Sequence, residues 1–188
     1  MSKSHSKNSN YLFRLAGFEV VLMRTFIVET TKQDYEEYYR IRCSPADIFW
    51  NGYEQKPDYD AFREIFMERI CTAPFLEAES RRIYLVQNEE GINIGFTQLI
   101  LHDDCIEIGY SIVEDYQGKG HATEALRQML TIARKIRKRV IVRIRDDNKA
   151  SQRVAIKNGF VKTEKFVIKD YPKTGTVKLR TYELVSNA

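Results

Sequence analysis

The sequence contains no long hydrophobic run. No apolar stretch approaches the ~20 residues that a membrane-spanning helix needs, so we expect no membrane partner. Residues 1–5 are polar and lead into a polar segment that lacks the apolar core of a signal peptide. We therefore expect a cytoplasmic protein rather than a secreted one.

Cysteine is scarce. Cys43, Cys71 and Cys105 lie far apart in the sequence, and none of them belongs to a CxxC pair. An odd number of cysteines at this spacing argues against a disulfide framework and against a zinc site, and it suits a reducing compartment. We expect no metal cofactor.

An excess of one charge is also missing. The 30 Lys and Arg residues nearly balance the 26 Asp and Glu residues, which leaves a net charge of +4. The densest basic run, residues 134–139, is either a nucleic-acid patch or the cationic end of a helix, where the helix dipole favours positive charge. No aromatic residue that stacks on bases interrupts the run. We favour the helix end and expect no nucleic-acid partner.

No internal repeat, low-complexity tract or long linker interrupts the chain. Hydrophobic residues make up 43% of the sequence and charged residues 30%, which is the balance of a globular protein. We predict one domain over residues 23–188, long enough to bury a core. Residues 1–22 belong to no clear element and are treated as an N-terminal extension of undetermined structure.

Hydrophobic periodicity divides the domain into helices and strands. Thr31 and Asp34 have the spacing of a capping box and open the first helix. Ser44-Pro45 reads as its end, followed by a loop over residues 46–57. The expected helices cover residues 31–43, 58–72, 118–138 and 148–158, and the second is expected to bury Phe62, Ile65, Phe66 and Ile70. The expected strands cover residues 24–28, 81–87, 91–101, 105–113, 140–145, 160–169 and 176–185.

This order of elements indicates an α/β fold. A mostly antiparallel meander meets a β-α-β crossover, and the crossover makes its two strands parallel. We predict a single mixed sheet with a central parallel pair, flanked by helices.

The segment after the third strand of the meander carries the main functional signal. A strand runs into the sequence Gln117-Gly118-Lys119-Gly120-His121-Ala122-Thr123, which opens an amphipathic helix. Glycines let the backbone expose its N–H groups, and a helix N-terminus attracts anions, so this turn suits a phosphate or pyrophosphate. It is not a Walker A loop, because Gly120 follows Lys119 where Ser or Thr is required.

A second motif follows at residues 148–160. It contains Asn148, Ser151, Lys157 and the pair Gly159-Phe160. Together with the pattern Q-x-x-G-x-G/A, read here over residues 117–122, it resembles the GNAT superfamily of N-acetyltransferases. The similarity covers residues 91–162 and is greatest to the branch that contains ribosomal-protein alanine and spermidine acetyltransferases.

The resemblance implies acetyl-CoA as co-substrate and an amine as acceptor. In the family, pantetheine lies between two splayed parallel strands and the pyrophosphate lies on the glycine loop. The cofactor-binding residues implied here are Tyr110, Ser111, Ile112, Val113, Gln117, Gly118, Lys119, Gly120, His121, Ala122, Thr123 and Asn148. Gly109 is the expected place for a bulge that separates the strands. Asn148 is also the expected N-cap of its helix, and Lys119 either adds charge or is solvated.

Two side chains are expected to move protons. Acetyl transfer needs a neutral amine and a proton for the leaving thiolate. Glu107 is the expected base, because a glutamate among apolar strand residues is a local inconsistency of the kind found at functional sites. Many members of the family carry a tyrosine where this chain has Ala155, so Ser151 is the expected acid, with tyrosines and water as alternatives.

The acceptor pocket is the least defined part of the prediction. The resemblance implies walls from the loop over residues 46–57, with Phe49 and Trp50, and from the last strand turn. Asp47 and other acids in this region either attract a cationic amine or are solvated loop residues. The expected partner is a small-molecule amine or a protein N-terminus, and a homodimer is an assembly that the sequence allows. The alternative function is a regulatory module that binds acyl-CoA without catalysis.

Overall fold

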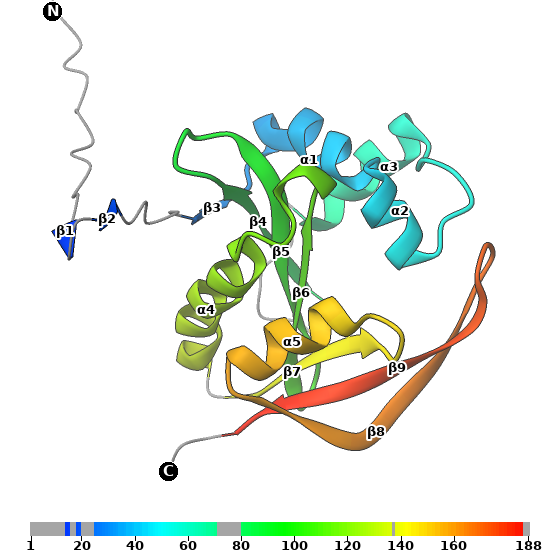
Figure 1. The fold of residues 1–188 in the computed structure, drawn as a ribbon. Coiled ribbons are helices and arrows are strands. Elements are labelled where there is room, and N and C mark those ends of the chain that lie inside the picture. The colour runs from blue at the N-terminus through cyan, green and yellow to red at the C-terminus, as the bar shows by residue number, and fades with distance from the viewer. Residues whose placement is uncertain (1–13, 16–17, 20–24, 71–79, 137, 186–188) are drawn as a thin grey trace, which may run out of the picture.

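The computed structural model describes residues 14–15, 18–19, 25–70, 80–136 and 138–185 (Figure 1). Most of the predicted extension, residues 1–22, lies outside this part of the chain. Within it, β1 (Arg14–Leu15) and β2 (Phe18–Glu19) form a two-stranded antiparallel sheet of their own.

One seven-stranded mixed sheet organises the domain. Its spatial order is β3-β4-β5-β6-β7-β9-β8, and β6 and β7 are the parallel pair within it. The strands are β3 (Phe26–Glu29), β4 (Arg81–Gln87), β5 (Asn93–Leu101), β6 (Cys105–Ile112), β7 (Arg139–Arg145), β8 (Phe160–Tyr171) and β9 (Gly175–Leu184). The predicted fold class, a mixed sheet with a central parallel pair, is confirmed.

Five α-helices flank this sheet: α1 (Tyr35–Arg42), α2 (Pro45–Asn51), α3 (Tyr59–Ile65), α4 (His121–Ala133) and α5 (Lys149–Lys157). Short helical turns adjoin them at η1 (Lys32–Asp34), η2 (Phe66–Ile70), η3 (Glu114–Tyr116) and η4 (Arg134–Ile136). Figure 1 shows α1, α2 and α3 grouped at one end of the molecule, with α4 and α5 beside the central strands. The β8–β9 hairpin curves toward the end of the domain that carries α2.

Alternation along the strands creates a core on each face of the sheet. On one face, Ile106 and Ile108 of β6 pack with Leu126 and Met129 of α4. On the other, Tyr35, Tyr38 and Ile41 of α1 pack with Phe66 and with residues of β4 and β5. The predicted amphipathic character of α4 is therefore confirmed.

The capping box before α1 is also confirmed. The Thr31 hydroxyl accepts a hydrogen bond from the Gln33 amide at 3.3 Å, and the Asp34 carboxylate accepts one from the Thr31 amide at 2.7 Å. Both bonds satisfy amides that have no partner within the helix.

The predicted loop over residues 46–57 is partly wrong. Ser44 accepts from the Asp47 amide at 3.3 Å as the N-cap of α2, and Pro45 is its first residue. Proline suits that position because its missing N–H would have no helical partner there. Ser44-Pro45 thus begins a helix, whose end is capped by Gly52 in a left-handed conformation.

The second predicted helix needs a smaller correction. Phe66 is fully buried, but Ile65 is 45% exposed, because Phe62 and Phe66 face the core one turn apart and Ile65 lies on the flank. The π-helical turn η2 begins at Phe66. The Ile70 side chain and the predicted helix end at residue 72 lie outside the described residues.

The basic run at residues 134–139 lies at the end of α4 and the start of β7, as the helix-end interpretation predicts. Lys138 donates to the backbone carbonyls of His102 and Asp103, at 2.9 and 2.8 Å. Arg139 forms ion pairs with Asp104 and Glu183. These two cations therefore join β7 to its neighbours in the sheet.

Candidate active site

The two parallel strands separate beyond their first residues. Their pairing runs from Cys105↔Arg139 to Glu107↔Ile141. Further along, β6 continues to pair with β5, while β7 pairs with β9. The predicted opening between residues 110–113 and β7 is therefore present in the sheet.

Gly109 does not produce this opening through a bulge. The β5–β6 register is continuous from Leu101↔Ile106 to Gly95↔Ile112. A Cβ at Gly109 would come within 2.8 Å of Gln98 Nε2, so glycine instead leaves room for the Gln98 side chain. The predicted bulge is wrong at this position.

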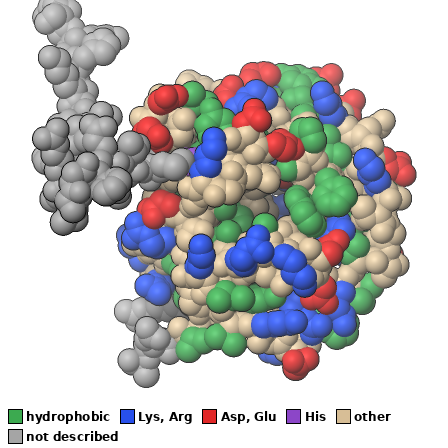
Figure 2. All heavy atoms as spheres, viewed as in Figure 1, with side chains coloured by type: hydrophobic (Ala, Val, Ile, Leu, Met, Phe, Trp, Pro, Cys, Tyr) green, Lys and Arg blue, Asp and Glu red, His purple; other side chains and the backbone are tan. Residues whose placement is uncertain are grey.

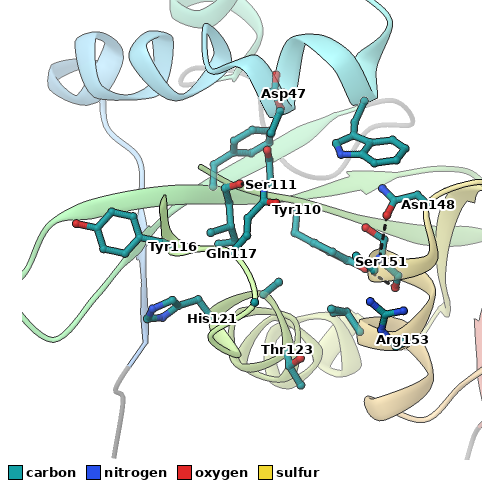
Figure 3. Close-up of a pocket in the computed structure, with 18 of the residues that line it drawn as sticks. Asp47, Tyr110, Ser111, Tyr116, Gln117, His121, Thr123, Asn148, Ser151 and Arg153 are labelled. Atoms are coloured by element: carbon teal, nitrogen blue, oxygen red, sulfur yellow. Dashed lines mark hydrogen bonds between the residues drawn. The ribbon is translucent and has the colours of Figure 1, made fainter. Parts of the chain in front are cut away.

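A cavity of about 390 Å³ lies where the strands separate. Figure 3 shows side chains reaching into it from α2, β6, the loop before α4, and α5. Its lining includes most of the predicted cofactor-binding residues: Tyr110, Ser111, Ile112, Gln117, Gly118, Gly120, His121, Ala122, Thr123 and Asn148. Lining residues that the sequence did not suggest include Arg42, Asn51, Phe96 and Gln98.

The glycine loop forms an open cradle at the N-terminus of α4. Gly118 and Gly120 have φ values of 74° and 93°, and a Cβ on either one would meet nothing within 4 Å. Gly120 is the N-cap and brings no side chain, so the first amides of α4 stay open to a ligand. Gln117 closes the turn by donating from Nε2 to the Ile112 carbonyl at 2.7 Å. These features fit a pyrophosphate.

The backbone hydrogen-bonding groups at the end of β6 and at Val113 point alternately toward β5 and toward the opening. The Val113 amide donates to the Ile94 carbonyl at 2.9 Å, and its carbonyl accepts from the Tyr116 amide at 3.0 Å. Val113 is absent from the cavity lining. Because backbone groups alternate between the two edges of a strand, Tyr110 and Ile112 point theirs toward the opening instead.

Lys119 and His121 behave differently within the loop. Lys119 is exposed, lies outside the lining and places Nζ 5.3 Å from the centre of the Tyr116 ring. His121 is 2% exposed, and its Nδ1 lies 2.9 Å from the Thr25 hydroxyl. Burial lowers the pKa of His121, so its ring is neutral at pH 7.

The start of α5 forms the opposite wall of the cavity. Asn148 Oδ1 accepts from the Ser151 amide at 3.0 Å, which confirms the predicted N-cap. Tyr110 donates its hydroxyl to the Ser151 carbonyl at 3.0 Å. Ala155 is fully buried. Figure 2 shows lysine and arginine side chains gathered over α5 beside a hollow in the surface, and Arg153 and Lys157 belong to the lining.

Glu107 lies apart from the cavity. It occupies the paired part of β6, forms an ion pair with Arg143, and has Oε2 3.1 Å from His102 Nε2. It is not among the lining residues. The position of Glu107 therefore gives no support to its expected role as the base, which stays a prediction.

Helix α2 supplies the wall on the far face of the sheet. Trp50 lines the cavity, whereas Phe49 is 44% exposed and lies outside the lining. The two rings meet edge to face at 4.8 Å, and the Arg145 guanidinium lies 5.4 Å from the centre of Phe49 and 5.2 Å from that of Trp50. The structure thus brings one of the two predicted acceptor residues into the site.

Asp47 is far more buried than its expected position in a loop suggests. It is 1% exposed, lines the cavity, and lies 3.0 Å from Arg42 Nη1. Burial raises the pKa of Asp47 to about 6, against the lowering effects of the Arg42 charge and of the nearby polar side chains of Ser111 and Asn51. The available signal was Ser44-Pro45, which makes Asp47 the third residue of a helix rather than part of a loop.

No helix in the described ranges is long and apolar enough to cross a membrane. The described residues also contain no group of three or more His, Cys, Asp or Glu side chains placed to hold a metal ion.

Comparisons with known proteins identify the family. Residues 24–161 match the model of the acetyltransferase (GNAT) domain, and the chain belongs to this family. It is an N-acetyltransferase that depends on acetyl-CoA, in agreement with the prediction from the two motifs. No curated protein matches the sequence.

Solved structures share the fold at low sequence identity. A spermidine N-acetyltransferase from Vibrio cholerae, in complex with CoA and spermine, has a TM-score of 0.69 at 16% identity, covering 84% of this chain and 94% of the other. An aminoglycoside acetyltransferase with coenzyme A has a TM-score of 0.63 at 16% identity and the same two coverages. A putative acetyltransferase from Acinetobacter baylyi has a TM-score of 0.66 at 18% identity, covering 89% and 96%.

Proposed function

We propose that the protein transfers an acetyl group directly from acetyl-CoA to a primary amine within a ternary complex. One observation carries the proposal: a single cavity joins the glycine loop before α4 to the α2 wall. Its volume of about 390 Å³ is within the usual range for small-molecule sites. Because the cavity is continuous, the thioester and the amine can meet in it without an acetylated enzyme between them.

The co-substrate is proposed to lie along the opening between β6 and β7. Amides from Gln117 to Thr123 surround the pyrophosphate, and Arg153 and Lys157 add positive charge at the rim. Tyr110 offers its backbone groups to the pantetheine arm and Ile112 its amide, since the Ile112 carbonyl already accepts from Gln117. Ser111 and Asn148 contact the arm from either side. Because the Val113 backbone groups are already bonded, we leave Val113 out of this set. Lys119 is proposed to contribute its amide and not its side chain, since the residue lies outside the lining.

Acetyl-CoA supplies the activated acyl group, and the residues of this chain supply orientation and a proton. Ser151 is proposed to donate a proton to the departing sulfur, directly or through water. Its side chain lines the cavity beside Tyr110, whose own hydroxyl proton is engaged by the Ser151 carbonyl. A free thiol has a pKa of about 8.5, so the thiolate leaves readily and the acid is helpful rather than indispensable.

The acceptor is proposed to be a small-molecule amine or a protein N-terminus that enters beside α2. Trp50 lines this side, and an aromatic face attracts a cation. Similar structures are of enzymes named for spermidine and for aminoglycosides, both of which carry several amines. Phe49 is proposed to act on the outer rim, next to Arg145, and not inside the pocket.

A panel of amines tests this proposal against the alternative of an acyl-CoA-binding module without catalysis. Release of CoA thiol from acetyl-CoA is followed with polyamines, aminoglycosides, amino acids and peptides, and mass spectrometry identifies the product. We expect turnover with at least one amine, and initial-rate lines that intersect when both substrates are varied. Parallel lines would indicate a covalent acetyl-enzyme instead. CoA binding without turnover on any amine would support the alternative.

A further inference from the structure

The acceptor amine needs a group that removes its proton. Most primary amines are protonated at neutral pH, and an ammonium nitrogen has no lone pair with which to attack a carbonyl. Glu107 is held by Arg143 outside the cavity. Of the described residues that line the cavity, Asp47 alone carries a carboxylate.

The Asp47 carboxylate can accept one more hydrogen bond. Its side chain is 1% exposed, and Oδ2 makes no geometrically acceptable hydrogen bond within the described structure, although Arg42 Nη1 lies 3.0 Å away. The Arg42–Asp47 hydrogen bond reaches the other oxygen, Oδ1, at a long 3.4 Å. A buried oxygen without a hydrogen bond is costly, and an N–H group of a ligand removes that cost.

Arg42 is only partly committed to Asp47. Its Nη2 donates to the Tyr53 hydroxyl at 2.7 Å. Its guanidinium lies 5.3 to 5.8 Å from the ring centres of Phe96, Tyr53 and Phe62. These contacts hold part of the arginine against aromatic rings, so it balances the charge of Asp47 while sharing the cavity wall with it.

We propose that Asp47 binds the ammonium group of the acceptor and takes its proton. This inference rests on the proposed function and deepens it, because it assigns the amine-binding end of the cavity to α2. Ser111 of β6 contacts the same carboxylate, which places Asp47 next to the strand along which the co-substrate is proposed to lie.

The proton balance of the reaction is complete with this assignment. The acceptor arrives as an ammonium ion, and the Asp47 carboxylate takes one proton and leaves a neutral amine. The nitrogen then attacks the thioester carbon, so that a C–N bond forms and the C–S bond breaks. The second proton of the nitrogen passes through Ser151 or water to the sulfur, which leaves as a thiol. Asp47 finally releases its proton to water.

The charged environment of Asp47 sets the pH at which it works. Arg42 and Tyr38 approach from α1, Tyr53 follows α2, and Glu114 approaches from the loop after β6. Burial in this environment raises the pKa of Asp47 to about 6. At neutral pH it is therefore mostly ionised and still basic enough to accept a proton.

The test compares pH–rate profiles of the full-length parent and Asp47→Asn, with the amine that gives turnover in the panel. For the parent, kcat/KM should rise through about pH 6 and then level off. For Asp47→Asn we expect a loss of about a hundredfold or more at pH 7. That loss should shrink about tenfold for each pH unit above 7, since the free amine must then come from solution.

Two matched variants complete the test. Asp60→Asn removes an exposed carboxylate from the first turn of α3 and should reproduce the parent profile. Glu107→Gln tests the assignment made from sequence alone. The inference fails if Glu107→Gln abolishes the rise of kcat/KM near pH 6 while Asp47→Asn retains that rise, because Asp47 is then not the proton acceptor.

Affinity for CoA shows whether a loss of activity in Asp47→Asn comes from the chemical step or from misfolding. Asp47→Asn should bind CoA within about threefold of the parent, because the carboxylate contacts the amine and not the phosphates. If Asp47→Asn does not bind CoA, Asp47→Glu is tested in its place. The rise of kcat/KM in Asp47→Glu should then occur at a different pH from that of the parent. A rise at the same pH overturns the inference. A parent that acetylates no amine refutes the proposed function itself, which is a different result from an active parent whose profile is independent of Asp47.

Discussion

The backbone of Gly52 lies directly against the ring of Tyr171. A Cβ added at Gly52 would overlap the ring carbons, and the residue has a φ of 67°. Gly52 ends α2 and Tyr171 ends β8, where its side chain is 8% exposed. This contact joins the helix that carries Asp47 to the long β8–β9 hairpin.

Two glycines with the same φ allow the cost of backbone strain to be measured apart from the cost of steric overlap. Gly175 also has a φ of 67°, but a Cβ there would meet nothing within 4 Å. We expect Gly175→Ala to lower the free energy of unfolding by about 1 kcal/mol, through backbone strain alone. Gly52→Ala adds the overlap with Tyr171 and should cost about 3 kcal/mol. Urea denaturation of both variants measures the difference, and equal losses would show that the contact is not tight.

The glycine loop is tested by a charge. Gly120→Asp places a negative side chain where the pyrophosphate is proposed to lie, so the affinity for CoA should fall more than about tenfold. Gly91→Asp is the control, because Gly91 has a similar φ of 79°, equal space around it and no place in the cavity lining. Calorimetry should give unchanged CoA affinity for Gly91→Asp. If Gly120→Asp retained the affinity for CoA, the proposed position of the pyrophosphate would be wrong.

Two helix caps distinguish stability from binding. Asn148 caps α5 through the Ser151 amide at 3.0 Å, and Asp58 caps α3 through the Ala61 amide at 2.9 Å. Replacing either residue with alanine should cost about 1 kcal/mol of stability. We expect only Asn148→Ala to weaken CoA binding, as measured by the same titration. Equal CoA affinities for the two variants would reduce Asn148 to a structural cap.

Ser151 is tested by loss and rescue. We expect Ser151→Ala to lower kcat by about ten- to a hundredfold, the low end for a general acid, because a thiolate is a tolerable leaving group. The fold should persist, because Asn148 accepts from the backbone amide of residue 151 and not from its hydroxyl. Adding Ala155→Tyr restores a donor on the same helix; Ala155 is fully buried, so stability is measured alongside the rate. An unchanged kcat in Ser151→Ala would make water the proton source.

His121 links the stability of the site to pH. Burial lowers its pKa below the ordinary value of about 6.5, so the unfolded chain binds a proton more readily than the folded one. The stability that His121 contributes is complete above about pH 6.5 and is lost as pH falls below it. His121→Gln should therefore be less stable than the parent at pH 7.5, and the difference should shrink toward pH 5.5. Thermal melts at both pH values measure this, and a constant difference would contradict it.

The order of strands and the position of the glycine loop could be predicted from the sequence because both depend on local signals. Alternation along residues 105–112 predicts the strand, and the glycines after Gln117 predict the turn. The Ser44-Pro45 pair is equally local, but it marks the end of one helix and the start of the next. Its interpretation as an end placed Asp47 in a solvated loop.

Glu107 and Asp47 show why the site itself was harder to predict. Both are carboxylates near apolar residues in the sequence, but the contacts that distinguish them join distant segments. Arg143 of β7 reaches Glu107 on the adjacent strand β6, and Ser111 of β6 meets Asp47 of α2. No periodicity reports such pairings, because they depend on which strands are neighbours and where β6 and β7 separate.

The separation of β6 and β7 also affects how the protein avoids aggregation. An unpaired strand edge is normally a template for other chains, and proteins shield such edges at the rim of a sheet. Here the open edge at Tyr110 and Ile112 lies in the interior of the sheet, with β5 on one side and β7 on the other. A second polypeptide strand would have to fit its side chains between two strands that converge at Glu107 and Ile141. The protein therefore keeps unpaired backbone groups inside its sheet, where they are not presented to other chains along a rim.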